Sequence, residues 1–384
     1  MARKIGLVVT ARPSYARIKT ALQAIEKHRD LELQLIVAAS ALLDRYGSVV
    51  QYIENDGFKI SARVFIVLEG ENLITSAKST GLGIMELATI FDNLRPDVVV
   101  TVADRFETLA TAVAASYMNI PVAHVQGGEV TGSIDEKVRH AVTKLSNLHF
   151  VSTKQAGERV IRMGEDPKSV YVTGCPSIDL AADVLRDPDM KFDPFEKYGG
   201  VGYQQDLSDG YLVVMQHPVT TQFGESRAQI TETLEAVEAL DMPAFWFWPN
   251  VDAGADGISR GIRIFREQGR GKRVHYFKNM EPEDFIRLIN NSRAIVGNSS
   301  AGIRESSFLG VPSVNIGERQ AGRERGRNVI DVPHEAKEIQ KAITTHLANG
   351  RYASEHIYGE GKAGERIADL LASVELKVAK QISY

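Results

Sequence analysis

Residues 121–140, PVAHVQGGEVTGSIDEKVRH, place several reactive side chains directly after a short apolar run. The run ends at Gln126, and Glu129, Asp135 and Arg139 follow. Asp135 and Arg139 are four positions apart, so a helix would place them on one face. A carboxylate can transfer a proton, and an arginine can stabilise an anion. A surface ion pair explains the spacing of Asp135 and Arg139 equally well.

The same stretch contains Gly127, Gly128 and Gly132, which allow a ligand to approach the backbone closely. Because these glycines follow a predicted strand, they favour a functional role for the acids and the arginine beside them.

Polar residues also follow other apolar runs in the first half of the chain. They are Arg12 and Tyr15 in TARPSY, Asp104 and Arg105 in ADRFE, and Asp179 in GCPSID. A helix N-cap explains Asp104 equally well, and the preference of a first helical turn for acids explains Asp179.

In the second half, the polar residues after apolar runs suit an anionic ligand. His217 in QHPVTT can donate to a phosphate or carry a proton, although a lone histidine is usually a half-buried polar group. Asn250 and Asp252 follow the next run, in WPNVDAG. Arg319 and Arg323 supply cations for a diphosphate, or belong to an ordinary charged loop.

The stretch VGNSSAGIRE is the richest in such residues. Its small residues, Ser299, Ser300 and Gly302, open a predicted helix whose first N–H groups form an anion site. Glu305 is placed to accept hydrogen bonds from a ribose.

These residues need a fold that brings strand ends together. Short β-branched runs alternate with helical patterns, which is typical of parallel βαβ units. The predicted strands are 4–9, 33–39, 98–103, 122–125, 149–152, 170–173, 211–215, 244–248, 274–277, 294–297 and 313–316, and the predicted helices include 106–118, 335–348 and 364–381. Residues 186–209 have no sustained period and are interpreted as an interdomain connection.

The sequence therefore predicts an α/β protein with two Rossmann-like, doubly wound domains that face a cleft. Residues 1–185 form the first domain, which carries the acids, and residues 205–363 form the second, which binds a nucleotide diphosphate. Ligands of such folds bind at the carboxyl ends of the strands.

Composition limits the class of protein. With 384 residues, 43% hydrophobic and 24% charged, the chain is typical of a soluble globular protein. We expect no membrane span and no secretory signal, because the apolar runs are short. A single cysteine, Cys175, excludes an intramolecular disulfide and fits a cytoplasmic location. A net charge of −4 gives no reason to expect a nucleic acid or a membrane as a partner.

No single motif decides the function, since the chain has no Walker A motif, no G-x-G-x-x-G after the first strand and no metal-ligand spacing. Taken together, ADRFE, HVQGGEVTGSIDEKVRHAVTKL, GCPSID, QHPVTT, WPNVDAG and GNSSAGIRE with GERQ resemble the hydrolysing UDP-N-acetylglucosamine 2-epimerases of sialic-acid pathways. The resemblance covers almost the whole chain. It implies a glycosyltransferase-B type fold, a C-terminal helix within 364–384 that crosses back to the first domain, and a homodimer or homotetramer.

The resemblance also implies a reaction that uses no cofactor and no metal ion. The C2 proton and UDP leave by anti elimination, which gives a 2-acetamidoglucal. Water then adds at C1 while C2 is reprotonated on the other face, which releases N-acetylmannosamine and UDP. By matching position, the catalytic or substrate-orienting residues would be Asp104, Gln126, Glu129, Asp135, Arg139, Asp179 and His217. The residues that bind UDP would be Arg12, Tyr15, Arg105, His217, Asn250, Ser299, Ser300, Gly302, Glu305 and Arg319.

Gln126 departs from the family pattern. Well-known members read HIEGGE where this chain reads HVQGGE, and Ala103 stands where glycine is usual. An amide cannot exchange a proton near neutral pH, but it can hydrogen-bond an N-acetyl group. Three explanations compete: an engineered inactive variant, a natural branch in which Glu129 or Asp135 takes over, and a branch with a different sugar. Two neighbouring departures favour a natural branch.

The leading hypothesis is a hydrolysing 2-epimerase that acts on UDP-N-acetylglucosamine. The alternative is the same chemistry on another nucleotide sugar, such as UDP-2,4-diacetamido-2,4,6-trideoxyglucose for a legionaminic-type acid. Two further classes stay open: a glycosyltransferase of the same fold and a nucleotide-sugar sensor without turnover.

Overall fold

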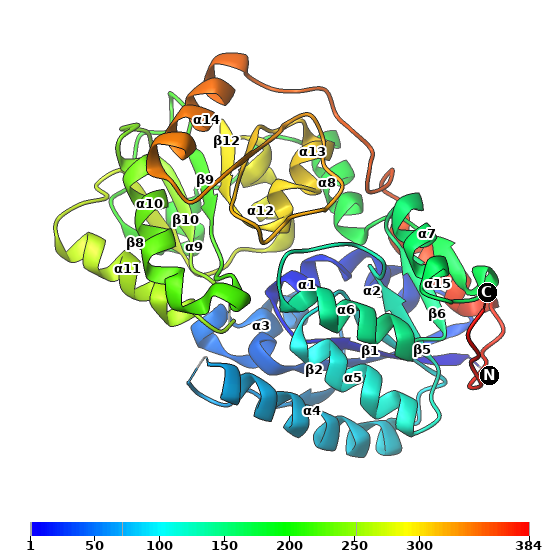
Figure 1. Cartoon of the computed structure of the whole chain (residues 1–384). Helices are drawn as coiled ribbons and strands as arrows, with labels where there is room; N and C mark the ends of the chain where they lie inside the picture. The colour runs from blue at the N-terminus through cyan, green and yellow to red at the C-terminus, as the bar shows by residue number, and fades with distance from the viewer. Residues whose placement is uncertain (1, 71, 251, 384) are drawn as a thin grey trace. The chain divides into compact units, whose positions relative to one another are not determined.

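The computed structural model describes residues 2–70, 72–250 and 252–383. Met1 and Tyr384, at the ends of predicted ranges, and Val251, within WPNVDAG, lie outside the described residues. The chain divides into two compact units (Figure 1). Unit 1 is Met1–Glu129, Ile134–Leu180 and Tyr358–Tyr384, and unit 2 is Val130–Ser133 and Ala181–Ile357. The domain ranges 1–185 and 205–363 stay a prediction.

Unit 1 is built on a seven-stranded parallel sheet with the order β3-β2-β1-β4-β5-β6-β7. Its strands are β1 (Arg3–Val9), β2 (Leu31–Ala38), β3 (Ile60–Val64), β4 (Val98–Val102), β5 (Val122–Val125), β6 (Leu148–Val151) and β7 (Val170–Val172). Its helices are α1 (Arg12–Ala16), α2 (Lys19–Lys27), α3 (Val49–Asn55), α4 (Leu73–Leu94), α5 (Phe106–Tyr117), α6 (Ile134–Leu145), α7 (Lys154–Arg162) and α15 (Ala363–Ser373). Helix α8 (Pro176–Arg186) begins in unit 1 and ends in unit 2.

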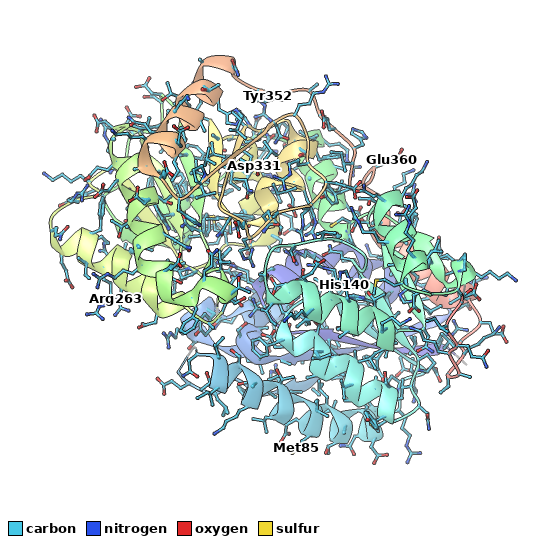
Figure 2. All side chains as sticks on the ribbon, in the orientation of Figure 1. Met85, His140, Arg263, Asp331, Tyr352 and Glu360 are labelled. Carbon is cyan, nitrogen blue, oxygen red and sulfur yellow. The ribbon has the colours of Figure 1, made fainter. Side chains whose placement is uncertain are left out.

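Both faces of this sheet are buried, which explains why its strands are nearly continuous apolar runs. On β1, Ile5 and Leu7 pack with α2 and α15 on one face, while Val8 packs with α4 and α5 on the other. Every residue of β4 is buried. The outer side of α4 is exposed, and Met85 points away from the sheet (Figure 2). Helices thus cover both faces of the sheet.

Unit 2 has a second seven-stranded sheet, with the order β14-β13-β12-β9-β10-β11-β8. Its strands are β8 (Val201–Gly202), β9 (Leu212–Met215), β10 (Ala244–Phe247), β11 (Val274–Phe277), β12 (Ala294–Gly297), β13 (Ser313–Ile316) and β14 (Val329–Val332). Its helices are α9 (Pro194–Tyr198), α10 (Ser226–Glu238), α11 (Ala255–Glu267), α12 (Pro282–Asn290), α13 (Glu305–Leu309) and α14 (Ala336–Asn349). The short edge strand β8 pairs antiparallel with β11, and the other pairs are parallel.

Aromatic residues fill the core of unit 2 on both sides of its sheet. Trp246 and Tyr276 pack with residues of α10 and α11. On the opposite side, Phe247 contacts Phe277 and meets Phe285 of α12 edge to face. Neighbouring positions of a strand point to opposite faces, so β10 and β11 supply aromatic rings to both layers.

The two units share one topology. Counted from β1 and from β9, the first six parallel strands have the order third, second, first, fourth, fifth, sixth. This is the strand order of the Rossmann fold. The predicted fold class, α/β with two Rossmann-like doubly wound domains, is therefore confirmed. All eleven predicted strands are present, and their ends differ from the predicted ones by at most two residues.

Two predicted segments were wrong. The last helix ends at Ser373, and residues 374–383 are not helical. The segment 186–209 is not an irregular connection throughout, because it contains α9 and β8. Asp193 starts α9 by accepting a hydrogen bond from the N–H of Phe195, with proline at the first helical position.

Candidate active site

Each sheet has one point at which the strand order changes direction, between β1 and β4 in unit 1 and between β9 and β12 in unit 2. Loops leave such a point in opposite directions, and ligands of doubly wound folds bind there. Arg12 follows β1 and Asp104 follows β4, while His217 follows β9 and Ser299 follows β12. These predicted residues therefore lie at the positions where the fold can hold a ligand.

Three non-glycine residues at strand ends of unit 1 have a left-handed backbone. They are Ala39 after β2 (φ 54°), Ala103 after β4 (φ 67°) and Gln126 after β5 (φ 68°). This conformation costs a residue with a Cβ atom about 1 kcal/mol. Such residues persist where other contacts hold them, and they gather at functional sites. The carboxyl edge of this sheet is thus the part of unit 1 best suited to chemistry.

A buried ion pair joins the end of β4 to α6. Arg139 donates from Nη2 to Asp104 Oδ2. Its Nη1 donates to the Glu129 carbonyl at 2.9 Å and to Glu136 Oε2 at 2.8 Å. Arg17 Nη1 lies 4.0 Å from the other oxygen of Asp104. The Asp104 carboxylate is therefore held in a fixed orientation beside two cations.

Asp135 and Arg139 lie on α6, as their spacing predicted, but Arg139 forms its ion pairs with Asp104 and Glu136. Burial lowers the pKa of Arg139, but the carboxylates of Asp104, Glu129 and Asp135 outweigh burial and raise it. Asp135 thus acts on this arginine through its charge.

Gln126 is buried, with 1% of its surface exposed. Its Nε2 donates to Cys175 Sγ at 2.9 Å, and its backbone N–H donates to the Phe150 carbonyl at 2.9 Å. Among the described residues, Gln126 Oε1 has no hydrogen-bond partner. A buried acceptor without a partner is costly, and a substrate N–H or hydroxyl group can satisfy it. The neighbouring acid Glu129 is also buried and accepts from Ser152 Oγ at 3.0 Å.

Protein atoms, rather than a ligand, lie against the glycines of this stretch. This corrects the prediction that these glycines allow a ligand to approach the backbone. A Cβ atom at Gly128 would lie 2.2 Å from the Ala156 carbonyl oxygen. In unit 2, a Cβ atom at Gly132 would lie 2.0 Å from the Glu318 carbonyl oxygen. Both distances are far below van der Waals contact, so packing alone requires these glycines.

Asp179 has both carboxylate oxygens engaged by the protein. Oδ1 accepts from the N–H of Ala363 at 2.8 Å, and Oδ2 accepts from the N–H of Gly364 at 2.7 Å and from Thr20 Oγ1 at 2.8 Å. These N–H groups begin α15, so Asp179 caps that helix from α8. The contacts favour a structural role, and a catalytic role for Asp179 stays a prediction.

Two arginines contribute positive charge at the switch point of unit 1. Burial lowers the pKa of Arg12 to about 10, and the charge of Arg105 adds to this effect. Arg105 donates to both oxygens of Glu107, at 3.2 and 3.3 Å. Burial disfavours the charged form of Arg12, so an anion such as a phosphate would stabilise it. The third residue predicted here, Tyr15, donates its hydroxyl to Asp56.

In unit 2, Asn298 ties the end of β9 to the end of β12. Its side chain accepts from the backbone N–H of His217 at 2.7 Å and donates to the His217 carbonyl at 2.8 Å. The backbone N–H of Asn250 donates to His217 Nδ1 at 3.3 Å. Because Nδ1 accepts this bond, the neutral imidazole carries its proton on Nε2. His217 can therefore donate, as predicted for a residue that binds phosphate.

The loop after β12 is built from small residues. Ser299 Oγ accepts from the N–H of Ala301 at 3.3 Å and caps the short 3-10 turn Ser300–Gly302. A Cβ atom at Gly302 would lie 2.8 Å from Ser313 Oγ, so this position needs glycine. The predicted anion-binding residues thus form one compact turn at the switch point.

Glu305 is the first residue of α13 and is buried, and its Oε2 has no hydrogen-bond partner among the described residues. Arg319 Nη1 and Gln320 Nε2 both donate to the Asn298 carbonyl, at 3.2 and 2.9 Å. The loop after β13 is therefore fixed to the loop after β12. A ribose hydroxyl can donate to this open acceptor, and the role of Glu305 as a ribose ligand stays a prediction.

Three residues that organise these loops were not predicted from the sequence: Asn298, Glu136 and His124. Asn298 stood in the NSS stretch, directly after a strand, where a polar side chain is a usable signal. Glu136 precedes Arg139 by three positions, which is also helical spacing. His124 is a polar residue inside an apolar strand.

In residues 2–70, 72–250 and 252–383, no group of three or more His, Cys, Asp or Glu side chains is placed to hold a metal ion. Within the same ranges, no helix has both the length and the apolar character needed to cross a membrane.

Comparison with known proteins points to one family. The family model described as UDP-N-acetylglucosamine 2-epimerase matches residues 23–372. The UDP-N,N'-diacetylbacillosamine 2-epimerase (hydrolyzing) of Legionella pneumophila is 32% identical over 98% of this chain and 97% of its own length. The UDP-N-acetylglucosamine 2-epimerase of Neisseria meningitidis is 28% identical over 97% of this chain and 96% of its own.

Solved structures agree on the fold. The UDP-GlcNAc 2-epimerase of Neisseria meningitidis bound to UDP-GlcNAc has a TM-score of 0.77 at 20% identity, and covers 96% of this chain and 99% of its own. The enzyme of Methanocaldococcus jannaschii in complex with UDP-GlcNAc and UDP gives the same four values. The fold is therefore of the glycosyltransferase-B type.

Proposed function

Because the chain belongs to the UDP-N-acetylglucosamine 2-epimerase family, we propose that it is a hydrolysing 2-epimerase of a UDP-linked 2-acetamido sugar. The first candidate substrate is UDP-N-acetylglucosamine, which would give N-acetylmannosamine and UDP. One observation supports this proposal most: Asp104, at the strained end of β4, is held by buried Arg139, with the charges of Glu129 and Asp135 close by.

The reaction needs groups of these kinds. A carboxylate removes the C2 proton, the electron pair forms the C1=C2 bond, and the C1–O bond breaks as UDP leaves with its electrons. Water then adds its hydroxyl to C1, and C2 receives a proton on the opposite face. General acid–base catalysis of such steps contributes about 10²- to 10⁴-fold. We assign these proton transfers to Asp104, Glu129 and Asp135.

The UDP group would be bound by the polar residues of the strand ends. His217 Nε2 and the turn Ser300–Gly302 suit the phosphates, and Glu305 suits the ribose. We keep the other predicted ligands, which are Arg12, Tyr15, Arg105, Asn250, Ser299 and Arg319. This binding requires no metal ion, because the cations and N–H groups named here can take up the charge of the leaving diphosphate.

A second candidate substrate is a UDP-2,4-diacetamido-2,4,6-trideoxy sugar. Gln126 favours it, because this residue offers an amide with an open acceptor where a carboxylate is usual in the family, and an amide N–H of an acetamido group is a suitable donor. The similarity to the diacetylbacillosamine 2-epimerase of Legionella pneumophila supports the same candidate.

The test is incubation of both UDP-sugars with the enzyme in deuterium oxide, with nucleotide and sugar followed by NMR. We expect UDP and a free 2-epimeric sugar that carries deuterium at C2. Unlabelled sugar, or no release from any UDP-sugar, contradicts the proposal. A product that keeps its anomeric linkage to an acceptor would indicate a glycosyltransferase, and binding without turnover would indicate a sensor.

Three further properties are proposed with this function. The chain would act in the cytoplasm as a homodimer or homotetramer, and its domains would be residues 1–185 with 364–384 and residues 205–363. Light scattering of the purified chain tests the oligomeric state.

A further inference from the structure

His124 has no role in the reaction proposed above, although it lies directly beneath the candidate site. It is in the middle of β5 and is fully buried. In the sheet it is paired with Thr101 of β4 on one side and with His149 of β6 on the other. An imidazole at such a position needs partners for both ring nitrogens.

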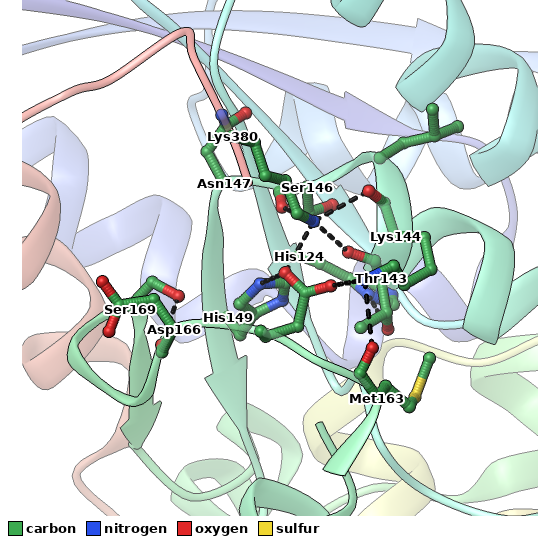
Figure 3. A network of polar contacts seen from close by, with 12 residues as sticks. His124, Thr143, Lys144, Ser146, Asn147, His149, Met163, Asp166, Ser169 and Lys380 are labelled. Atoms are coloured by element: carbon green, nitrogen blue, oxygen red, sulfur yellow. Dashed lines mark hydrogen bonds and ion pairs between the residues drawn. The ribbon is translucent and has the colours of Figure 1, made fainter. Parts of the chain in front are cut away.

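Both nitrogens of His124 have a partner. Nε2 lies 2.8 Å from the Ala103 carbonyl oxygen, and Nδ1 lies 3.2 Å from Thr143 Oγ1 of α6. Figure 3 shows His124 and Thr143 next to each other. A carbonyl oxygen only accepts, so Nε2 carries the proton. Nδ1 therefore accepts, and Thr143 donates its hydroxyl to it.

The imidazole is neutral. Burial lowers the pKa of His124 to about 3, and the positive charge of Arg139 and a neighbouring His149 act in the same direction. The Ala103 carbonyl and the Asp104 carboxylate oppose this change without overcoming it. His124 thus keeps one donor and one acceptor throughout the physiological pH range.

The two bonds reach the parts of the molecule that hold the acids. Ala103 has a left-handed backbone, and Asp104 is the next residue. Thr143 lies one helical turn beyond Arg139, whose guanidinium binds Asp104. Two bridges therefore join the same face of α6 to the same turn. One is Arg139 to Asp104, and the other runs from Thr143 through His124 to Ala103.

We propose that His124 is a positioning residue of the 2-epimerase reaction: its neutral imidazole holds the strained Ala103–Asp104 turn against α6. Arg139 orients the carboxylate of Asp104, and His124 fixes the backbone from which that carboxylate projects. The same arrangement explains why position 127 is a glycine, since a Cβ atom there would lie 2.9 Å from His124 Nδ1 and 3.0 Å from Thr143 Oγ1. This inference rests on the proposed function.

The test uses a matched pair of variants. His124→Gln can place its amide N–H near the position of Nε2 and keep the bond to Ala103, whereas the shorter side chain of His124→Asn cannot. We expect His124→Asn to lower kcat about tenfold to a hundredfold with KM unchanged, because small misplacement of a catalytic group costs this much. His124→Gln should retain most of the activity. In an Ala103→Gly background, where the left-handed turn is free of strain, the loss caused by His124→Asn should shrink.

The opposite results overturn the proposal. They are equal losses in the two variants, a rise in KM without a fall in kcat, or a loss that Ala103→Gly does not reduce. If His124→Asn does not fold, Thr143→Val replaces it, because valine keeps the shape of threonine but cannot donate to Nδ1. An unchanged kcat for Thr143→Val would then refute the role of His124.

A second measurement is independent of turnover. Hydrogen exchange of the backbone amides of Asp104 and its neighbours should be faster in His124→Asn than in wild type, and close to wild type in His124→Gln. If wild-type protein releases no nucleotide from any UDP-sugar, that result contradicts the proposed function, while the exchange measurement still decides whether His124 holds the turn.

Discussion

Gln126 combines burial, a left-handed backbone and an amide oxygen without a partner among the described residues. Its other amide atom is bound to Cys175, which itself lies 3.0 Å from Ser177 Oγ. A substitution at a residue held in this way changes its buried hydrogen bonds, so it affects stability or function. Gln126 therefore either contributes to substrate recognition, or other acids carry out the proton transfer that a glutamate at this position performs in other family members.

The variant Gln126→Glu separates these possibilities. If Glu129 or Asp135 has taken over the chemistry, we expect kcat to change by no more than about fivefold, since restoring a required acid would raise it by about 10²-fold or more. Stability should fall by about 1–3 kcal/mol, because a buried carboxylate replaces the donor to Cys175. Turnover of both UDP-sugars and urea unfolding measure the two effects.

Gln34→Glu is the matched control, because Gln34 is also buried, donates one hydrogen bond, to the Leu94 carbonyl, and has a buried Oε1 without a partner among the described residues. It lies within β2, away from the strand ends, so it should lose stability without losing kcat. A gain of about 10²-fold in Gln126→Glu alone would show that the wild-type chain is disabled.

At the level of single residues, the sequence predicted which side chains lie at strand ends but not their partners. The spacing of Asp135 and Arg139 indicated a local pair, whereas Arg139 binds Asp104, which is 35 positions away. A contact of this kind depends on β4 and α6 being neighbours in space. The caps that Asp179 provides for α15 were unpredictable for the same reason.

Among the elements, α6 depends on the segment that follows α15. Lys380 Nζ donates to the carbonyls of Thr143, Lys144 and Ser146, at 3.1, 2.7 and 2.6 Å, which places a cation at the C-terminal end of α6 (Figure 3). It also lies 2.6 Å from Glu165 Oε2. The C-terminal segment thus fixes the helix whose first half carries Asp135 and Arg139.

The contact of Lys380 with Glu165 makes the attachment of the C-terminal segment to α6 depend on pH. Burial raises the pKa of Glu165, but hydrogen bonds from His149, Lys144 and Lys380 outweigh burial and lower it from 4.5 to about 2. A folded-state pKa below the unfolded value stabilises the fold above the unfolded pKa. This contribution, about 3 kcal/mol, is complete above pH 4.5 and is lost as the pH falls toward 2. Burial also lowers the pKa of His149. The fold therefore loses stability as the pH falls below 6.5 as well, because the unfolded chain then binds a proton that the folded chain does not.

We therefore expect Glu165→Gln to be about 3 kcal/mol less stable than wild type at pH 7, with the difference shrinking as the pH falls below 4.5. Urea unfolding at a series of pH values measures it. Glu158→Gln, at an exposed position of α7, is the control and should change stability by less than about 0.5 kcal/mol. A difference for Glu165→Gln that stays constant with pH would contradict the assignment.

Every strand that is buried on both faces was predicted, whereas among the exposed or partly exposed edge strands β7 was predicted and β3, β8 and β14 were not. The runs of β4, β9 and β12 are apolar at nearly every position, so their type was evident. The edge strands β3 and β14 are partly exposed and carry Arg63 and Asp331, so their patterns were not recognised. The last helix was predicted to be too long because Leu376 and Val378 continue an apolar pattern. In the structure, the carbonyl groups of Lys377 and Val378 instead accept hydrogen bonds from the side chain of Asn147.

On the scale of the whole molecule, two units of the same topology carry different chemistry at equivalent positions. After β1 and β4, unit 1 presents Arg12 and the buried Asp104–Arg139 pair. After β9 and β12, unit 2 presents His217 as a donor and the turn Ser300–Gly302. The fold was predictable because both halves repeat the strand–helix alternation, whereas the division of labour between the two units stays a prediction from the residue types.

This division predicts that turnover and nucleotide affinity respond to different substitutions. Asp104→Asn keeps an acceptor for Arg139 but cannot exchange a proton, so kcat should fall by about 10²- to 10⁴-fold while the Kd for UDP changes by less than about threefold. Glu305→Gln removes a charged acceptor from the proposed ribose site, so the Kd for UDP should rise about tenfold. Calorimetric titration with UDP and turnover of UDP-sugar measure both quantities for each variant. If Asp104→Asn weakened UDP binding as much as Glu305→Gln, the acid of unit 1 would be a nucleotide ligand, and the separation of chemistry from nucleotide binding would fail.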